Sequence, residues 1–321
     1  METQPEKVAL EADILVRPLQ ESDLPAADQT MRMAFGTFLD LPDPSMFMGD
    51  ANYVKTRWLA DPAAAFGAEV DGEFIGSNFA TNWGSVGFFG PITIRPDHWD
   101  HGVGKRLMEP IIECFGKWGT KHAGLFTFAQ SQKHVGLYQK FGFWPRFLTA
   151  VMSKPIVRSN RAAQWSAFSQ SEADTTLATC RQLTDSVYEG LDVTREIRAV
   201  ADQNLGETVL LWDGSTLNGL AVCHCGPNTE AGSGTCYIKF AAVRSGPGAA
   251  RAFELLLDAC EDMAATRGLS RIVAGVNTAR QEAYAQMMAR AFRTDIQGVA
   301  MHRPNEPGYN RAGVYVIDDW R

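Results

Sequence analysis

The sequence of 321 residues has no apolar run of the roughly 20 residues that a membrane-spanning helix requires. It also lacks a basic face, because its 30 Lys and Arg residues are interspersed among 37 Asp and Glu residues, for a formal net charge of -7. Nucleic-acid binding needs a concentrated basic surface, and the short basic stretch around Arg158 and Arg161 indicates only a solvated linker. We therefore expect neither a membrane nor a nucleic acid among the partners.

The sequence also lacks an export signal and a disulfide pattern. It begins with METQPEKVALEAD, which is acidic and polar, unlike a signal or transit peptide. The six cysteines stand singly except for Cys223 and Cys225, which is typical of reduced thiols in a cytoplasmic protein. Cys-His-Cys at 223–225, with Cys236 nearby, raises the question of a metal site, but no second ligand pair has zinc spacing and the alternation fits a strand. We expect no metal.

What the sequence does contain is a repeated order of elements. Hydrophobic residues make up 45% and charged residues 21%, as in a soluble protein with a full core. One order of elements occurs twice: a strand (in the second half a linker), two helical segments, a hairpin, a strand, a helix, a strand, a helix and a strand. The predicted hairpin turns are Asp71-Gly72 and Asp213-Gly214. The repeat predicts an internal duplication of the α/β class, with domains at 1–155 and 169–321 and a linker at 156–168.

A glycine turn, WDHGVGKRL at 99–107, lies between a predicted strand and a predicted helix. Gly102 and Gly104 allow the backbone to approach a ligand, and the helix N-terminus favours an anion. The dinucleotide fingerprint does not fit, because Leu107 stands at the third glycine position. The P-loop does not fit either, because Arg106 follows Lys105 where Ser or Thr is needed. The spacing alone leaves an anion site and a purely structural turn open.

The stretch ITIRPDHWDHGVGKRL resembles the central motif of the GNAT superfamily of acyl-CoA-dependent N-acyltransferases: a strand, then Gln/Arg-x-x-Gly-x-Gly/Ala, then a helix. Trp99 stands where the family usually has Gln or Arg. The resemblance implies two tandem GNAT-like domains, each a mixed, mostly antiparallel sheet flanked by helices, with acetyl-CoA as co-substrate. It also implies these cofactor-binding residues: Ile92, Thr93, Ile94, Trp99, His101, Gly102, Val103, Gly104, Lys105 and Arg106.

A second stretch, SQKHVGLYQKFGF, resembles the last helix of the family, in which a tyrosine stands four residues before Gly-Phe. The resemblance implies that Tyr138 protonates the leaving thiolate, and a phenol suits that task because it is neutral at pH 7. His134, one helical turn earlier, is the second candidate catalytic residue. The general base stays open between a water molecule, His134 and three acids: Glu69, Asp71 and Glu73.

The second half has the same order of elements but lacks the residues of the two motifs. Aligning the ends of the last helices places Met287 opposite Tyr138 and Ala291 opposite Gly142. Pro247 removes a backbone donor from the second glycine turn. We therefore expect residues 169–321 to be a degenerate GNAT-like domain that serves as a scaffold or binds the acceptor.

The expected function is acetyl transfer from acetyl-CoA to a primary amine by direct attack, with the active site in the N-terminal half. The acceptor stays open between a small-molecule amine and a peptide or protein amine, and the oligomeric state is open too. The alternative is a CoA-responsive binding or regulatory protein that turns over no amine. If the halves merely lie side by side, residues 1–157 should fold alone. We expect the charges of the tail, Asp318, Asp319 and Arg321, to be solvated.

Overall fold

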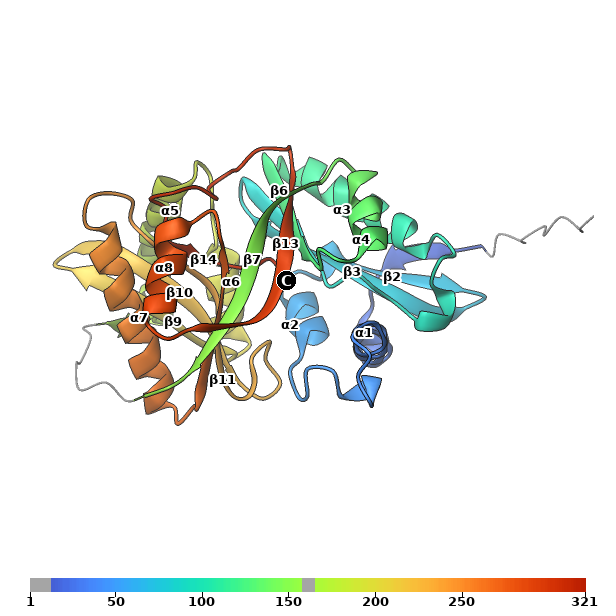
Figure 1. Ribbon diagram of the computed structural model, residues 1–321, viewed down its shortest axis with the longest axis horizontal. Coiled ribbons are helices and arrows are strands. Elements are labelled where there is room, and N and C mark those ends of the chain that lie inside the picture. The colour runs from blue at the N-terminus through green and yellow to red at the C-terminus, as the bar shows by residue number, and fades with distance from the viewer. Residues whose placement is uncertain (1–12, 158–164) are drawn as a thin grey trace, which may run out of the picture.

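The computed structural model describes residues 13–157 and 165–321 (Figure 1). The acidic N-terminal residues 1–12 and the basic pair Arg158 and Arg161 lie outside the described residues. The protein is α/β, as predicted, and its strands form one continuous mixed sheet of 14 strands flanked by helices. No helix in the described ranges combines the length and the apolar character needed to cross a bilayer.

The first half follows the predicted order of elements. The hairpin turns at Asp71 and Gly72, which have φ values of +52° and +81°, as a tight turn of this kind requires. Gly119, with φ +66°, ends the long helix after the glycine turn. The elements are β1 (Leu15–Pro18), α1 (Leu24–Phe38), α2 (Tyr53–Ala60), β2 (Ala65–Val70), β3 (Glu73–Trp83), β4 (Val86–Phe89), β5 (Thr93–Ile94), α3 (Val103–Trp118), β6 (His122–Thr127), α4 (Gln132–Gln139) and β7 (Trp144–Pro155).

The second half repeats this order. Part of the predicted linker is a short strand, β8, which pairs with β9 and so lies at one edge of the sheet. The elements are β8 (Ser166–Ala167), α5 (Ala173–Val187), α6 (Thr194–Asp202), β9 (Gly206–Asp213), β10 (Thr216–Gly226), β11 (Gly232–Val243), α7 (Ala249–Thr266), β12 (Arg271–Asn277), α8 (Gln281–Ala289), β13 (Arg293–Arg303) and β14 (Val316–Ile317).

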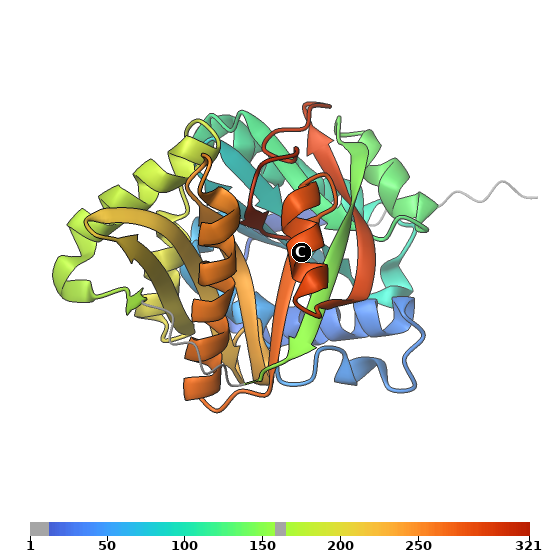
Figure 2. The ribbon, with the colours of Figure 1, turned by 60° about the vertical axis from the view of Figure 1, so that its left-hand side comes forward.

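The halves exchange strands at the middle of the sheet. Strand β13 of the second half lies between β6 and β7 of the first half, antiparallel to both. In return, β7 lies between β13 and β12 of the second half. Figures 1 and 2 show β7 and β13 crossing the centre of the molecule side by side. Each half therefore completes the sheet of the other, an arrangement that goes beyond two domains lying next to each other.

Buried charges also join the halves. Arg57 of α2 forms a two-pronged pair with Glu230 of the second half, with both N–O distances at 3.0 Å. Lys239 lies 2.9 Å from Glu230 and 3.0 Å from Glu196. Burial alone would raise the pKa of Glu230, but the charges of Arg57 and Lys239 hold this pKa well below its usual value. The four charges compensate one another, as buried charges must.

The sheet of the first half has helices on both faces. Phe79 of β3 packs with Ala27 and Met31 of α1. The next residue, Ala80, packs with Met108 of α3 instead. Because successive residues of a strand point to opposite faces, α1 and α3 cover opposite faces of the sheet. The two faces of the sheet in this half are therefore covered by different helices.

Candidate active site

The predicted cofactor loop follows β5 and ends at α3. The indole Nε1 of Trp99 donates to the carbonyl of Ile94 at 2.8 Å, so Trp99 fastens the loop to the end of the strand. The ammonium of Lys133 lies 5.7 Å from the centre of the Trp99 ring and 2.7 Å from Asp100. Trp99 and Lys133 thereby hold the glycine turn close to the start of α4. His101, next in the turn, is exposed.

Helix α3 begins with no side-chain cap. Gly102 is its N-cap residue, with φ +81°, and the carbonyl of Gly102 accepts the N–H of Lys105 at 3.0 Å. The N–H groups of Val103 and Gly104 belong to the first turn and therefore have no partner within the helix. Lys105 and Arg106 are exposed beside them. Donor groups, helix dipole and side-chain charge all favour a bound anion here.

The sequence suggests that Gly104 lets the backbone approach a ligand, whereas the structure shows that Gly104 also allows close packing between elements. A Cβ at this position would lie 3.2 Å from Leu137 of α4 and 3.3 Å from Ile94 of β5. The absence of a side chain lets α3 approach the strand and α4 closely. Val103 is also buried, within the apolar cluster that includes Leu107. After Gly102, Val103 and Gly104 thus offer their backbone, while the side chains of Lys105 and Arg106 face solvent.

The two parallel strands next to this loop part from each other. Strand β4 pairs with β6 only over residues 86–88, opposite 122–124. Beyond that point the chain turns away into β5, which pairs with β3, and Thr93 bonds through its hydroxyl to that of Ser77 at 3.2 Å. Strand β6 continues beside β13. A cavity of about 170 Å³ lies where β4 and β6 diverge. Ile92 and Ile94 line this cavity, whereas Thr93 does not.

The walls of the cavity come from both faces of the sheet and from both halves. The strands and the residues that directly follow them contribute Phe89, Gly90, Pro91, Leu125, Phe126, Thr127, Phe128 and Val151 from the first half and Ile296 from the second half. Helix α4 contributes His134, Leu137 and Tyr138. The opposite face contributes Met31 and Phe35 of α1, its C-cap residue Leu39, and Phe47, Met48 and Tyr53. Two residues of the tail, Trp320 and Arg321, complete it.

Tyr138 is one of the residues that line the cavity. Its side chain is 5% exposed, and its ring centre is 5.6 Å from that of Phe89. Burial raises the pKa of the Tyr138 phenol, while a hydrogen bond with Thr127 acts in the opposite direction. The phenol is therefore neutral at pH 7 and carries a proton that it can donate.

The structure brings only His134 of the predicted base candidates to the cavity. Burial lowers the pKa of His134, as does the charge of Lys133, so the imidazole is neutral and can accept a proton. Glu69 pairs with Arg17 and Glu73 pairs with Arg95, while Asp71 occupies the hairpin turn. None of these three acids lines the cavity.

The prediction that the tail is solvated was wrong. Asp318 and Asp319 are buried, at 2% and 3% exposure. Asp318 accepts from Arg280 at 2.8 Å and from the hydroxyl of Tyr309 at 2.8 Å. Asp319 accepts from the hydroxyl of Tyr237 at 3.0 Å and lies 3.0 Å from Nε of Arg321. Two of these partners, Arg280 and Tyr237, lie 38 and 82 residues away in the sequence. The visible signal was the apolar run before the acids, Val-Tyr-Val-Ile at 314–317.

Sequence reasoning also missed two residues beside the cavity. Tyr53 begins α2, whose N-cap Asn52 accepts the N–H of Lys55 at 3.0 Å. Arg57, one turn later, is buried and donates to the carbonyls of Gly90 and Arg321. Arg57 thus links α2 both to the residue that follows β4 and to the C-terminal tail. No short motif marks either residue, because their role depends on contacts with distant segments.

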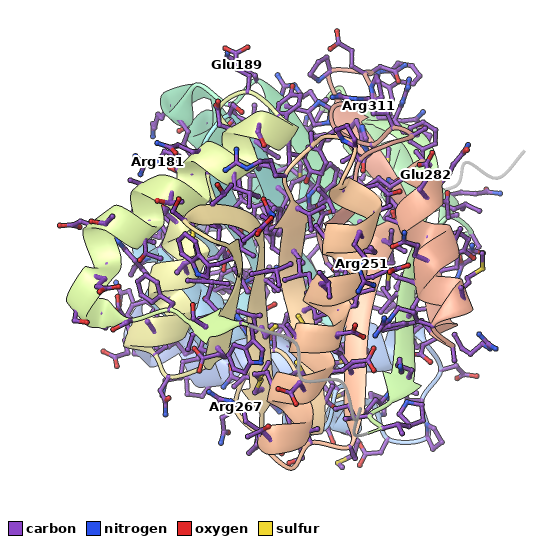
Figure 3. The ribbon with its side chains drawn as sticks, turned by 90° about the vertical axis from the view of Figure 1, so that its left-hand side faces the viewer. Arg181, Glu189, Arg251, Arg267, Glu282 and Arg311 are labelled. Atoms are coloured by element: carbon purple, nitrogen blue, oxygen red, sulfur yellow. The ribbon has the colours of Figure 1, made fainter. Side chains whose placement is uncertain are left out.

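In the second half, the equivalent gap between diverging strands is filled by another strand of the chain. Strand β11 pairs with β12 only over residues 235–238, opposite 271–274. Further along, β14 pairs with β11 and occupies the place where the first half has its cavity. Glu282 of α8, labelled in Figure 3, accepts the N–H of Gly313 at 2.8 Å and holds the loop that leads into β14.

The duplication is nevertheless visible in local geometry. The backbone carbonyl of Met287, whose side chain is fully buried, accepts the N–H of Phe292. The backbone carbonyl of Tyr138 accepts the N–H of Phe143 in the same way. Ala291 has φ +67°, the left-handed conformation that Gly142 adopts with φ +82°. Helix α7 carries an Arg251–Glu254 pair (Arg251 in Figure 3) where α3 carries Arg106–Glu109, at 2.8 and 3.1 Å. The aligned positions in the two halves are therefore structurally equivalent.

Cysteine residues of the second half lie within the sheet. Cys223 and Cys236 are fully buried, and Cys225 is paired across the strands with Cys236. Cys223 and His224 point to opposite faces of β10, as the alternation of a strand requires. Within residues 13–157 and 165–321 no group of three or more His, Cys, Asp or Glu residues could hold a metal ion.

Comparisons with known proteins agree with this geometry. The model of the acetyltransferase (GNAT) family matches residues 31–143, from α1 to the end of the Tyr138 helix. A putative acetyltransferase from Pyrococcus horikoshii aligns over 100% of this chain and 99% of its own, with TM-score 0.68 and 14% identity. A GCN5-related N-acetyltransferase from Sphaerobacter thermophilus aligns over 90% and 95%, with TM-score 0.58 and 16% identity. A search of curated proteins gave no match. Residues 31–143 therefore match the model of the acetyltransferase (GNAT) family, and the whole chain has a fold like that of the GCN5-related acetyltransferase structures.

Proposed function

We propose that the protein is an acetyl-CoA-dependent N-acetyltransferase that acetylates a primary amine of a small molecule, peptide or protein in the cavity between β4 and β6. The observation that carries the proposal is the placement of Tyr138 in this cavity, beside the uncapped start of α3. Membership of residues 31–143 in the GNAT family supports acyl transfer in general.

The residues at the site fit coenzyme A. The backbone N–H groups at the start of α3, together with Lys105 and Arg106, would hold the pyrophosphate. The opening between β4 and β6 is apolar and would accept the pantetheine arm. When bound, the co-substrate would supply an activated acetyl thioester. We propose that the second half binds no coenzyme A, because β14 fills its parting and Pro247 interrupts its turn.

Amide formation requires that the amine lose a proton, that the thioester carbonyl be polarised and that the departing sulfur gain a proton. Backbone N–H groups within residues 92–94 would polarise the carbonyl. Tyr138 would donate its phenolic proton to the sulfur and recover it from solvent. His134 or a water molecule would accept the proton of the amine.

The cavity itself assists the first of these requirements. Burial in apolar surroundings disfavours a charged ammonium group and so lowers its pKa. An amine that enters between Phe35, Phe89 and Phe126 is therefore biased toward its neutral, nucleophilic form. This bias is consistent with a cavity whose described lining residues include no Asp or Glu.

Tyr138→Phe tests the proposal. General acid catalysis is typically worth about 10²- to 10⁴-fold, so kcat should fall by roughly that factor in a thiol-release assay with an accepted amine. The ring remains, so calorimetry should show an almost unchanged affinity for CoA, with one site per chain. Met287→Leu, at the equivalent position of the second half, is the matched control and should keep kcat within about twofold. Full kcat in Tyr138→Phe would refute the role of Tyr138. A chain that binds CoA but releases no thiol with any amine would be a CoA-responsive binding protein instead.

A further inference from the structure

Four of the six cysteines gather at one place in the second half, on the face of the sheet that α7 covers. Cys223 and Cys225 belong to β10, Cys236 belongs to β11 and Cys260 belongs to α7. The Cys236 thiol lies next to those of Cys223 and Cys225, and the Cys260 thiol lies next to that of Cys223. All six cysteines of the chain are free thiols in the structure. The proposed acetyl transfer uses none of these four thiols.

Two of the four cysteines lie directly opposite each other on neighbouring strands. Cys225 of β10 pairs with Cys236 of β11 in an antiparallel ladder. The backbone N–H of Cys225 points away from β11, because it donates to the carbonyl of Leu205 at 2.8 Å on the other side of β10. Cys225 and Cys236 therefore form a pair with no backbone hydrogen bonds between them, and the Cα atoms of such pairs are about 4.5 Å apart. That separation lies within the range of roughly 4.4–6.8 Å that a disulfide bridges.

Other pairs in the cluster fit a disulfide less well. Cys223 lies opposite Ile238, two residues along β11 from Cys236. Diagonal neighbours of this kind are about 7–8 Å apart, which is beyond the range of a disulfide. Cys225 is half-buried, whereas the other three thiols of the cluster are fully buried. A small oxidant from solvent therefore meets Cys225 first.

The segment between Cys225 and Cys236 holds the start of α2 in the first half. The N–H of Asn52, the N-cap of α2, donates to the carbonyl of Thr229 at 2.9 Å. The N–H of Asn228 donates to the carbonyl of Asp50 at 3.1 Å. The segment also contains the buried carboxylate that pairs with α2. A covalent bond at the base of this segment would therefore strengthen the contact between the two halves.

We propose that Cys225 and Cys236 are a redox-sensitive pair, which a small-molecule disulfide oxidises to a cross-strand disulfide that closes the segment 226–235. The thiolate of Cys225 attacks the small-molecule disulfide, forms a mixed disulfide and releases one small thiolate. The thiolate of Cys236 then attacks the sulfur of Cys225, which forms the cross-strand bond and releases the second small thiolate. The two released thiolates take up the two protons that the protein thiols lose. Two protein thiols are thus oxidised, and one small disulfide is reduced to two thiols.

Thiol counting on the full chain tests the proposal. The reduced protein is incubated with oxidised glutathione, its remaining thiols are alkylated after unfolding, and its mass is measured. We expect six alkylated thiols before oxidation and four after it, because the bond consumes two of the six. Cleavage with trypsin and with a protease that cuts after Glu230 separates Cys225 from Cys236. The peptides that carry them should therefore stay joined until a reductant is added.

Variants locate the bond. Cys225→Ser should keep all five of its remaining thiols after oxidation, since it has one fewer than the six of the chain, while Cys223→Ala should still lose two. Cys114→Ala, on α3 and away from the cluster, is the matched control and should lose two as well. Closing a loop of this length stabilises the folded chain, so the oxidised protein should unfold about 5 °C above the reduced protein in thermal melts followed by circular dichroism. Cys225→Ser should show no such shift.

The outcomes decide the proposal in either direction. Six alkylated thiols after oxidation would overturn it, as would a loss of two thiols that persists in Cys225→Ser. A glutathione adduct that stays on Cys225 without a bond to Cys236 would overturn it too, because the two thiols would then be unable to meet. If a variant does not fold, the joined peptides of the unaltered chain still decide the matter. None of these results bears on the acetyl transfer, which is assayed separately with an amine.

Discussion

Residues 1–157, produced without the second half, should not form a stable monomer. Strand β13 would be missing from between β6 and β7, so β6 would lose the partner that pairs with residues 123–127. Strand β7 would lose both of its neighbours, β13 and β12. One edge of β6 and both edges of β7 would then be unpaired, and such edges expose backbone donors and acceptors and invite aggregation.

The side chains buried where the two halves exchange strands determine how much stability the fragment loses. Val299 and Met301 of β13 are 7% and 0% exposed and lie in the same core cluster as Tyr138. Val86 and Phe88 of the first half pack against the second half and would become exposed. Burying one such side chain is worth about 1.5–3 kcal/mol, so these four account for about 6–12 kcal/mol. The whole stability of a domain is about 5–15 kcal/mol, so the isolated half has little or none left.

Size-exclusion chromatography, thermal unfolding followed by circular dichroism, and CoA calorimetry on the fragment provide the assay. The matched control is co-expression of residues 1–157 with residues 158–321, because the exchange is mutual and the two pieces should complement each other. We expect an aggregated or unfolded fragment alone and a CoA-binding complex of the pair. A monomeric fragment that unfolds cooperatively and binds CoA would refute the reasoning, and β7 would then have taken the place of β13.

The elements and the cofactor loop could be predicted because their signals are local. Asp71-Gly72 marks the first tight turn at its two central residues, whereas the second turn is centred on Gly214 and Ser215, one residue later than predicted, because Asp213 still pairs with Thr216 in the hairpin. The turn at Gly102 adopts the left-handed conformation that a glycine there suggests. Each of these features depends on a few neighbouring residues, so a single sequence is enough to recognise them.

The strand exchange and the lining of the cavity could not be predicted, because they depend on contacts between distant segments. Nothing in the pattern of residues 144–155 distinguishes a strand that closes its own half from one that inserts into the other. Likewise, Asp318 and Asp319 look like solvated charges until Arg280 and Tyr237 are placed beside them. Tyr53 lies in an ordinary helix start, and only the fold brings it to the cavity.

Two further predictions concern stability. Ala291→Gly should raise the free energy of unfolding by about 1 kcal/mol, because Ala291 has φ +67° and glycine adopts this conformation without the Cβ penalty. Urea denaturation measures the change, Gly142→Ala should lower stability by a similar amount, and equal stabilities would contradict the argument. The second prediction is that stability falls as the pH decreases from about 6.5 toward 4.5. Burial lowers the pKa of three histidines, to about 4 for His122 and His224 and to about 3 for His302. In the unfolded chain a histidine has a pKa of about 6.5, so below that pH the unfolded state binds protons that the folded state does not. Each histidine therefore contributes a slope of up to about 1.4 kcal/mol per pH unit in this window and none above it. Urea denaturation at a series of pH values measures the slope, and His224→Gln should reduce it by the share of one proton. A stability that stays constant from pH 7 to pH 5 would show that the three histidines are as accessible to protons in the folded protein as in the unfolded chain.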